Sequence, residues 1–363
     1  MKKIVTLVCI AAMTLPTHAQ KKKSAEPEKT KLEQTSLGAL SFRSIGPATT
    51  SGRVADIAVN PNKTSEYYLA IASGGVFKTT NNGTTYEPIF DSYGSYSIGC
   101  ITIDPNNTNV IWVGSGENNN QRSVAYGDGV YKSVDGGSSF TNMGLKTSEH
   151  IGMIKVDPRN SNVVYVAAVG PLWSKGGERG LFKTEDGSKT WTNILNVSEN
   201  TGVNEIHFDP RNPDVIYATA HQRRRHVWTY ISGGPESAIY KSTDGGKSFD
   251  KLESGIPGGD KGRIAMAVSP VNPDVVYAMI EGHGFYSSTD RGASWAKQSS
   301  HATSGNYYVE IYAHPHDVNT IYSMDTYGHV SYDGGKSFGN INETKKHVDN
   351  HCMWIDPADT DHM

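Results

Sequence analysis

Three stretches of the sequence bring together charged, amide and aromatic side chains whose chemistry suits ligand binding. One runs from Glu117 to Arg122, a second contains Trp173 and Arg179, and a third contains three successive arginines. Guanidinium groups hold carboxylates, sulfates or phosphates, and aromatic rings stack on the faces of sugars or peptide groups. We therefore expect a site for a glycan, peptide or protein ligand. The residues predicted to form it are Arg53, Glu117, Arg122, Trp173, Arg179, His221, Arg223, Arg224, Arg225 and Trp228.

The run of three arginines also has a simpler interpretation. Runs of like charge are commonly solvated surface with no ligand. The rings of Trp173, Trp228 and Tyr230, which occur in the same stretches, favour a ligand instead. Both interpretations stay open at the level of sequence.

Glycoside hydrolysis is the catalytic alternative for the same stretches. It normally needs two carboxyl groups about 5 to 10 Å apart across the scissile bond. The available acids are Glu117, Asp128, Glu178 and Glu236. The sequence does not show which two of them lie close together in space, so we assign no catalytic residues. The sequence has no serine or cysteine nucleophile motif and no phosphate-cradling glycine-rich loop that opens a helix.

A metal site is conceivable at His347, Asp349 and His351. In an extended segment these three side chains point to one side, and imidazole and carboxylate groups are metal ligands. A hydrogen-bonded polar cluster is the favoured interpretation, because spacing places no further ligand beside them. We expect no metal and no other cofactor.

The elements that position these residues are short strands. The chain has 363 residues, with 38 glycines and 19 tyrosines, and 20% of it is charged. This composition is typical of strands joined by tight turns. The 34 basic and 37 acidic side chains give a net charge of −3, which argues against a nucleic-acid partner.

A two-part pattern recurs from Ser41 onward. Each copy has an apolar strand ending near a proline, an Asn/Asp-rich turn, a second strand with Tyr or Trp, and then a Gly-x-Tyr-Lys-like segment before a glycine turn. The copies follow at roughly the spacing of four-stranded propeller blades. The prolines that mark them are Pro61, Pro105, Pro158, Pro210, Pro270, Pro315 and Pro357. The pattern predicts an all-β fold, a β-propeller of six complete blades and a truncated seventh.

Each copy ends in a turn of the form Ser/Thr-x-Asp-x-Gly-x-Ser/Thr-aromatic. Its aspartates in the later copies are Asp135, Asp186, Asp244, Asp290 and Asp333, while the first copy has Asn81 instead. A short acid can accept hydrogen bonds from the amides of a tight turn, and glycine supplies the positive φ. We therefore expect these aspartates to be structural and not metal ligands or catalytic acids.

These turns resemble the Asp boxes (BNR repeats) of sialidases, two-propeller xyloglucanases, sortilin-type receptors and a photosystem assembly factor. The resemblance covers residues 41 to 363, and together with Phe42-Arg-Ser-Ile-Gly-Pro47 it is greatest to bacterial sortilin-N-terminal-like proteins, often described as glycosyl hydrolases. It implies a propeller and a receptor-like or hydrolase-like activity. Two features depart from the enzymes. The acid that precedes Gly-Gly in the first blade of xyloglucanases is absent before Gly74, and Arg43 only approximates a sialidase arginine.

The strand order places the three stretches on one rim. If each blade has strands A to D, the B-to-C connections emerge on the face opposite the Asp boxes. These connections are long in blades 2, 3 and 4, where the three stretches lie, and we expect them to converge. Gly52-Arg53 and its near copy Gly262-Arg263 begin A strands and are predicted to reach the same face.

The N-terminus reads as an export signal. Lys2 and Lys3 precede an apolar run too short to span a bilayer, followed by small residues near Ala19. The predicted organisation is a signal peptide at 1–19, a charged flexible linker at 20–40 and the propeller at 41–363, with no integral membrane segment after cleavage. We expect a bacterial protein that is secreted, periplasmic or associated with the cell surface.

Three functions are consistent with these features. The first is a binding module for a glycan, peptide or protein, the second is a xyloglucanase-like or sialidase-like glycoside hydrolase, and the third is an assembly scaffold. Because the seventh copy stops soon after Pro357, we also expect the chain to continue in a longer protein.

Overall fold

The computed structural model describes residues 35, 52–119, 124–305, 307 and 309–363. These residues form 25 strands and no helix, which confirms the predicted all-β class. The expected signal peptide and almost all of the expected linker lie outside the described residues. So do Arg43 and Arg122.

The strands of the described chain form six sheets in sequence order, so the prediction of six four-stranded blades is confirmed. Blades 1 and 2 are β1 (Val54–Val59), β2 (Tyr67–Ile71), β3 (Gly75–Thr79), β4 (Glu87–Pro88), then β5 (Ile98–Asp104), β6 (Asn107–Ser115), β7 (Val130–Ser133) and β8 (Thr141–Asn142). Blades 3 and 4 are β9 (Ile151–Asp157), β10 (Asn160–Ala168), β11 (Gly180–Thr184), β12 (Thr192–Leu195), then β13 (Thr201–Asp209), β14 (Asn212–Arg225), β15 (Tyr230–Ser232), β16 (Ala238–Ser242) and β17 (Asp250–Leu252). Blades 5 and 6 are β18 (Ile264–Val268), β19 (Val276–Ile280), β20 (Gly284–Ser288), β21 (Ala296–Ser299), then β22 (Glu310–Ala313), β23 (Ile321–Met324), β24 (His329–Ser331) and β25 (Gly339–Asn340).

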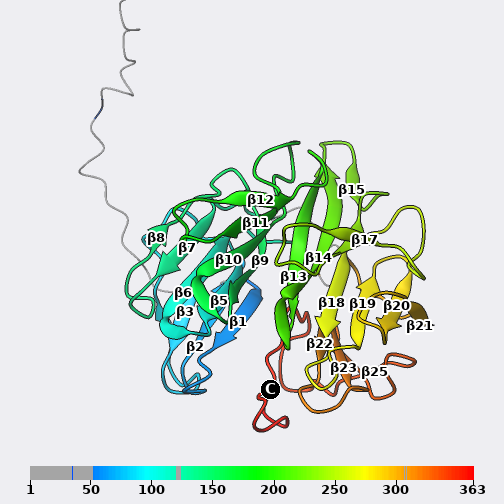
Figure 1. Cartoon of the computed structure of the whole chain (residues 1–363). Helices are drawn as coiled ribbons and strands as arrows, with labels where there is room; N and C mark the ends of the chain where they lie inside the picture. The colour runs from blue at the N-terminus through cyan, green and yellow to red at the C-terminus, as the bar shows by residue number, and fades with distance from the viewer. Residues whose placement is uncertain (1–34, 36–51, 120–123, 306, 308) are drawn as a thin grey trace, which may run out of the picture. The chain divides into compact units, whose positions relative to one another are not determined.

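Each blade is an antiparallel meander, and the A strands of successive blades lie side by side (Figure 1). The apolar core lies between the blades. Trp112 of blade 2 packs with Ile154 and Val166 of blade 3, and Tyr217 of blade 4 packs with Met266 and Ala278 of blade 5. A single blade cannot bury both faces of its sheet, so stacking of neighbours supplies the hydrophobic stabilisation.

The Asp boxes are C-to-D turns closed by the aspartate. In blade 2, the Ser139 amide and hydroxyl donate to Asp135 at 2.9 and 2.6 Å, and the Ser133 hydroxyl donates to it at 2.7 Å. These hydrogen bonds, the Ser139 hydroxyl first, lower the pKa of Asp135 to about 2. Both carboxylate oxygens accept hydrogen bonds from residues of the same turn, as expected of a structural residue.

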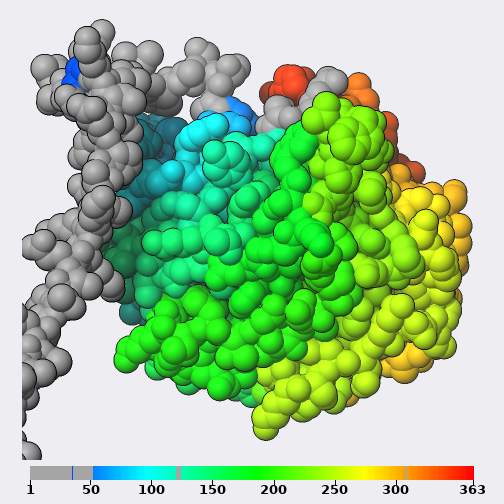
Figure 2. Space-filling view, turned by 90° about the horizontal axis from the view of Figure 1, so that it is seen from above, coloured from blue at the N-terminus to red at the C-terminus, as the bar shows by residue number. Residues whose placement is uncertain are grey.

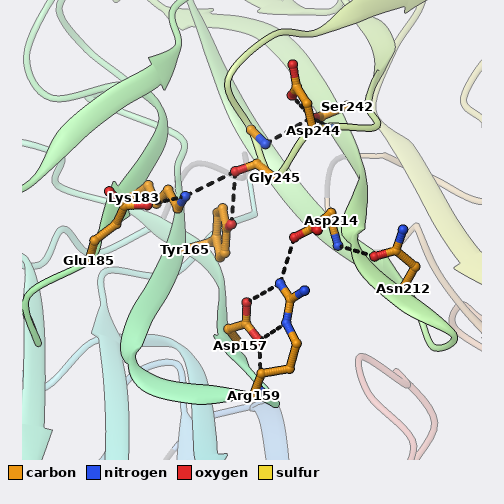
Figure 3. Close-up of polar contacts among 11 residues, drawn as sticks. Asp157, Arg159, Tyr165, Lys183, Glu185, Asn212, Asp214, Ser242, Asp244 and Gly245 are labelled. Carbon is orange, nitrogen blue, oxygen red and sulfur yellow. Dashed lines mark hydrogen bonds and ion pairs between the residues drawn. The ribbon is translucent and has the colours of Figure 1, made fainter.

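A repeated contact joins the Asp box of one blade to the strands of the preceding blade. The Tyr165 hydroxyl on β10 and the Lys183 ammonium on β11 both donate to the Gly245 carbonyl at 3.1 Å (Figure 3). In the same view, the Arg159 guanidinium bridges Asp157 of blade 3 and Asp214 of blade 4 at 2.7 Å. On the Asp-box rim, these hydrogen bonds and ion pairs therefore connect neighbouring blades.

A truncated seventh blade is not confirmed. Residues 343–363 contain no strand, and Asp349 has a φ of 74°, which interrupts an extended path. The segment instead packs between blades 6 and 1: Met353 and Ile355 contact the core of blade 6, and the Cys352 thiol lies 3.7 Å from the Val54 carbonyl. In the other blades the A strand forms hydrogen bonds with the second strand of the same blade. Residues 357–361, which follow the expected seventh A strand, form bends and turns and offer no such second strand.

Candidate functional site

The three long B-to-C connections span residues 116–129 in blade 2, 169–179 in blade 3 and the extended end of β14 with β15 in blade 4. In the view from above, the green and yellow-green surface of blades 3 and 4 lies between the cyan of the earlier blades and the yellow of blade 5 (Figure 2). Two of the expected residues, Trp173 and Trp228, are 55% and 82% exposed on these connections.

Arg223 joins the three connections. Its side chain is fully buried, and its guanidinium donates to the Asn119 carbonyl of blade 2 at 2.8 Å and to the Gly170 carbonyl of blade 3 at 3.3 Å. Burial lowers the pKa of Arg223 to about 9, so the group stays charged at neutral pH. The sequence predicts Arg223 as a ligand-binding residue. In the structure its side chain is buried and holds the loops, and Arg223 is also among the residues that line the pocket beside Arg224.

Glu117 is also buried. Its carboxylate forms an ion pair with Arg53 at the start of β1 and accepts a hydrogen bond from the Asn119 side chain. Its backbone carbonyl lies 2.7 Å from Nδ1 of His150, just before β9. Burial raises the pKa of Glu117, and the contact with Arg53 opposes this. Glu117 and Arg53 thus come together, in an arrangement that links blades 1, 2 and 3.

Two more of the expected residues are buried. Arg179 donates to the Pro171 and Ser174 carbonyls at 2.8 and 3.0 Å, and so closes its own loop. Neither ring nitrogen of His221 has a hydrogen-bond partner in the described chain. Burial lowers the pKa of His221 well below its usual range, so the ring is neutral.

The exposed part of the site is the tip of blade 4 with the adjacent loop of blade 3. The Arg225 amide donates to the Leu172 carbonyl at 2.9 Å, and the Arg225 guanidinium lies 4.5 Å from the centre of the Tyr230 ring. Arg224 lines a pocket of about 410 Å³ with Lys175, Asn200 and His226. Lys175 and Asn200 were not among the predicted residues, because their proximity to Arg224 depends on how blades 3 and 4 pack. His226 was not among them either, although it lies only two residues after Arg224.

The acids considered for hydrolysis are mostly engaged in local hydrogen bonds. Asp128 accepts from the Tyr131 hydroxyl at 2.6 Å, Glu178 from the Thr147 amide at 2.8 Å, and Glu236 from the Ser198 hydroxyl at 2.6 Å. Sequence reasoning missed Glu149, which precedes β9, has a φ of 60° and is only partly buried. Burial raises the pKa of its carboxyl, against the nearby Arg179 and Arg223 charges.

A second polar cluster lies on the A strands. The Arg263 guanidinium donates to Glu310 at 2.6 Å, and Glu205 accepts from the Met266 amide at 2.9 Å. Burial raises the pKa of both carboxyl groups, and the neighbouring Glu205 charge raises that of Glu310 further. The sequence signal for this cluster is an acid within an A strand, such as Glu205 of β13.

The proposed metal ligands do not form a site in the described residues. No cluster of three or more His, Cys, Asp or Glu side chains suited to a metal occurs there. The positive φ of Asp349 turns the segment, and His347 bonds to the Val348 carbonyl at 2.6 Å. The segment is therefore not extended across these three residues, and the geometry that a metal site would have needed is not present in it.

Comparison with known proteins supports the propeller fold. The family model described as Sortilin, neurotensin receptor 3 (Sortilin-Vps10) matches residues 237–363, about a third of the chain. The solved GH74 xyloglucanase from Xanthomonas campestris superposes with a TM-score of 0.59 at 17% identity, over 82% of this chain and 47% of that one. The chain is an Asp-box β-propeller.

Two other kinds of match bear on the function of the propeller. It is 24% identical to a probable oligoxyloglucan-reducing end-specific xyloglucanase of Neosartorya fischeri, over 60% of this chain and 26% of that protein. It is 28% identical to a xyloglucanase of Hypocrea jecorina, over 41% of this chain and 18% of that protein. The chain thus spans about a quarter of the first relative and less than a fifth of the second. YCF48 bound to D1 peptide superposes with a TM-score of 0.54 at 14% identity, over 86% of this chain and 90% of that one.

No segment among the described residues forms a helix long and apolar enough to cross a membrane.

Proposed function

We propose that this propeller is the glycan-recognising part of an exported, xyloglucanase-like glycoside hydrolase, and that it binds sugar on the B-to-C rim of blades 2 to 4. The observation that carries the proposal is the sequence relationship to xyloglucanases, which extends over 60% of the chain. It supports the hydrolase alternative better than the binding-only interpretation.

The rim has the chemistry that sugar binding needs. Trp173 and Trp228 are exposed, although large aromatic side chains are usually buried, and their flat faces suit stacking on sugar rings. In the same connections, the buried Arg223 and Glu117 hold the loops in fixed positions. A rigid base under exposed rings lowers the entropy lost when a ligand binds.

Glu149 is the candidate proton donor of this rim. A general acid must be reachable and must hold its proton near neutral pH, which a raised pKa favours. Glu149 is only partly buried, and burial raises the pKa of its carboxyl. The other acids of the rim are more fully engaged in hydrogen bonds.

The test is affinity electrophoresis and a reducing-end assay of the full-length protein on xyloglucan. We expect retardation by xyloglucan that weakens about tenfold in Trp228→Ala, and turnover that Glu149→Gln abolishes while retardation persists. Tyr332→Ala, an exposed ring on the Asp-box rim, is the matched control and should behave as wild type. Wild-type protein that is neither retarded by xyloglucan nor able to cleave it would refute the proposal.

Peptide binding is the second candidate. It is favoured by the superposition on YCF48 bound to D1 peptide, which covers 90% of that chain. Retardation by a peptide ligand with no response to xyloglucan would favour this candidate over the first.

A further inference from the structure

The hairpin of β14 and β15 has two chemically different faces. Side chains alternate along a strand, so Gln222, Arg224 and His226 point to one side while Arg223 and Arg225 point to the other. Ile231 pairs with Arg224 across the hairpin and shares its face. The first face lines the pocket of about 410 Å³, together with Lys175 and Asn200 of the neighbouring segments, and Arg223 also lines it.

Arg224 is unusual among the arginines near the surface. Arg159 and Arg211 each bridge two aspartates, at distances of 2.7 to 2.9 Å. Arg224 donates only to the neutral side-chain oxygen of Asn200, at 2.9 Å. Among the described residues, no carboxylate lies within ion-pair distance of it. A partly exposed guanidinium with donors to spare is a ready partner for an anion from outside the chain.

The other charges around the pocket leave it net positive. Lys175 pairs with Glu199 at 2.9 Å, but both side chains are more than half exposed, so this pair is weak and can exchange partners. Glu236 directs one oxygen to the hydroxyls of Ser198 and Thr201. Arg224 is therefore a cation of this pocket that has no ion pair with a carboxylate of the described residues.

A flat ring surface adjoins the cation. The His226 ring, which lines the pocket, stacks on Trp228 with centroids 5.3 Å apart and planes 12° from parallel. The Arg225 amide holds the hairpin against Leu172, the residue before the exposed Trp173. A ligand with both a planar apolar face and an anionic group could contact the stack and Arg224 together.

We infer that this pocket is a subsite for an acidic sugar, a hexuronic acid whose carboxylate binds Arg224 and Lys175 and whose ring lies against His226 and Trp228. The inference rests on the proposed function for its choice of a sugar. A hexuronate has both of the features that the pocket selects, in one rigid ring. The interaction is ionic, so it should weaken as salt rises.

The experiment compares an oligogalacturonate with its methyl ester, which has the same ring and length without the charge. Binding to the full-length protein is measured by calorimetry at low and high salt. We expect the acid to bind at least about tenfold more tightly than the ester, and Arg224→Gln to remove that preference while leaving affinity for the ester unchanged. Lys175→Gln should reduce the preference in part.

The matched control is Lys189→Gln, which removes an exposed charge from the Asp box of blade 3 on the opposite rim and should leave the preference intact. Equal affinity for acid and ester, an unaltered preference in Arg224→Gln, or tighter binding of a peptide with a free C-terminal carboxylate would each overturn the inference. Xyloglucan retardation, measured on the same samples, tests the proposed function separately, because that glycan is uncharged.

Discussion

Arg223 and Arg224 are adjacent on β14, yet they do different things because a strand points successive side chains to opposite faces. Both residues line the same pocket, but Arg223 is fully buried and holds carbonyl groups of blades 2 and 3, whereas Arg224 is partly exposed. The local sequence does not indicate which of the two arginines is buried. The packing of the loop of blade 2 against Arg223 decides it.

Replacing each arginine by alanine should separate the two roles. Arg223→Ala leaves buried carbonyl groups without a donor, and we expect it to lower the free energy of unfolding by about 2 to 4 kcal/mol. Arg224→Ala loses one hydrogen bond at a hydrated position, so its effect should stay below about 0.5 kcal/mol. Urea denaturation measures both. Equal losses in the two variants would show that Arg223 does not position the loops.

The acids on the A strands should make stability depend on pH. Burial raises the pKa of Glu205 and Glu310 above the ordinary value of 4.5, so the folded protein binds more protons than the unfolded chain above that pH. Stability should therefore fall as pH rises from 4.5 through the raised pKa values. Glu310→Gln removes one titrating group and should flatten the plot of melting temperature between about pH 5 and about pH 9.

The exposed Glu253 is the control for this experiment, since Glu253→Gln should follow the wild-type profile. A Glu310→Gln profile as steep as that of the wild type would mean that the cluster does not take up protons on folding.

At the scale of elements, the Asp box converts a short sequence into a closed turn. The first copy keeps the geometry with an amide: the Thr85 amide donates to Asn81 at 3.0 Å, and the Gly83 amide donates to the Thr79 hydroxyl at 3.0 Å. The glycine has a φ of 78°, which other residues rarely adopt. The turn therefore depends on the position of an acceptor more than on its charge.

Charge should still strengthen the turn. Asp186→Ala removes the acceptor for the Thr190 amide and hydroxyl, at 3.0 and 2.7 Å, and should lower the urea midpoint. Asn81→Asp adds a charge-assisted acceptor to the weakest copy and should raise the midpoint at neutral pH. The gain should shrink at pH 2, because a carboxyl whose pKa is near 2, as in the Asp boxes of Asp135 and Asp186, is only about half ionised there. An undiminished gain at pH 2 would contradict this explanation.

The Asp boxes also predict sensitivity to acid. Hydrogen bonds from their own turns lower the pKa of Asp135 and Asp186 from 3.8 to about 2. A lowered pKa in the folded state contributes stability above pH 3.8, and this contribution is lost as the pH falls toward 2. Melting temperatures in that interval should fall less steeply in the Asp135→Asn, Asp186→Asn double variant than in the wild type.

At the scale of the whole molecule, each blade depends on its neighbours. The apolar clusters each combine two successive blades, and the last combines blade 6 with Met353 and Ile355. In stacked repeats of this kind, stability is approximately a sum over neighbouring interfaces. The segment around Ile355 is therefore part of the packing of blades 6 and 1, although it forms no strand.

Ile355→Ala tests this role. The change removes apolar contacts with blade 6, and we expect a loss of about 1 to 2 kcal/mol, since the side chain is only partly buried. Hydrogen exchange should accelerate in blades 1 and 6 before it does so in blades 3 and 4. The exposed Val271 in blade 5 supplies the control, Val271→Ala. Uniform acceleration across all blades would show that they unfold as one cooperative unit.

The sequence by itself determined the blades, because everything that makes one is local: the alternating strands, the proline and glycine turns, and an Asp box that closes within eight residues such as Ser133 to Phe140. It also identified the three long connections that hold Glu117, Trp173 and Arg223. Only the tertiary structure decided which of these side chains are buried and which are exposed. Burial of Arg223 depends on carbonyl groups that lie more than 50 residues away in the sequence, and the pocket of Arg224 needs Lys175 and Asn200 from segments that meet only when blades 3 and 4 pack together.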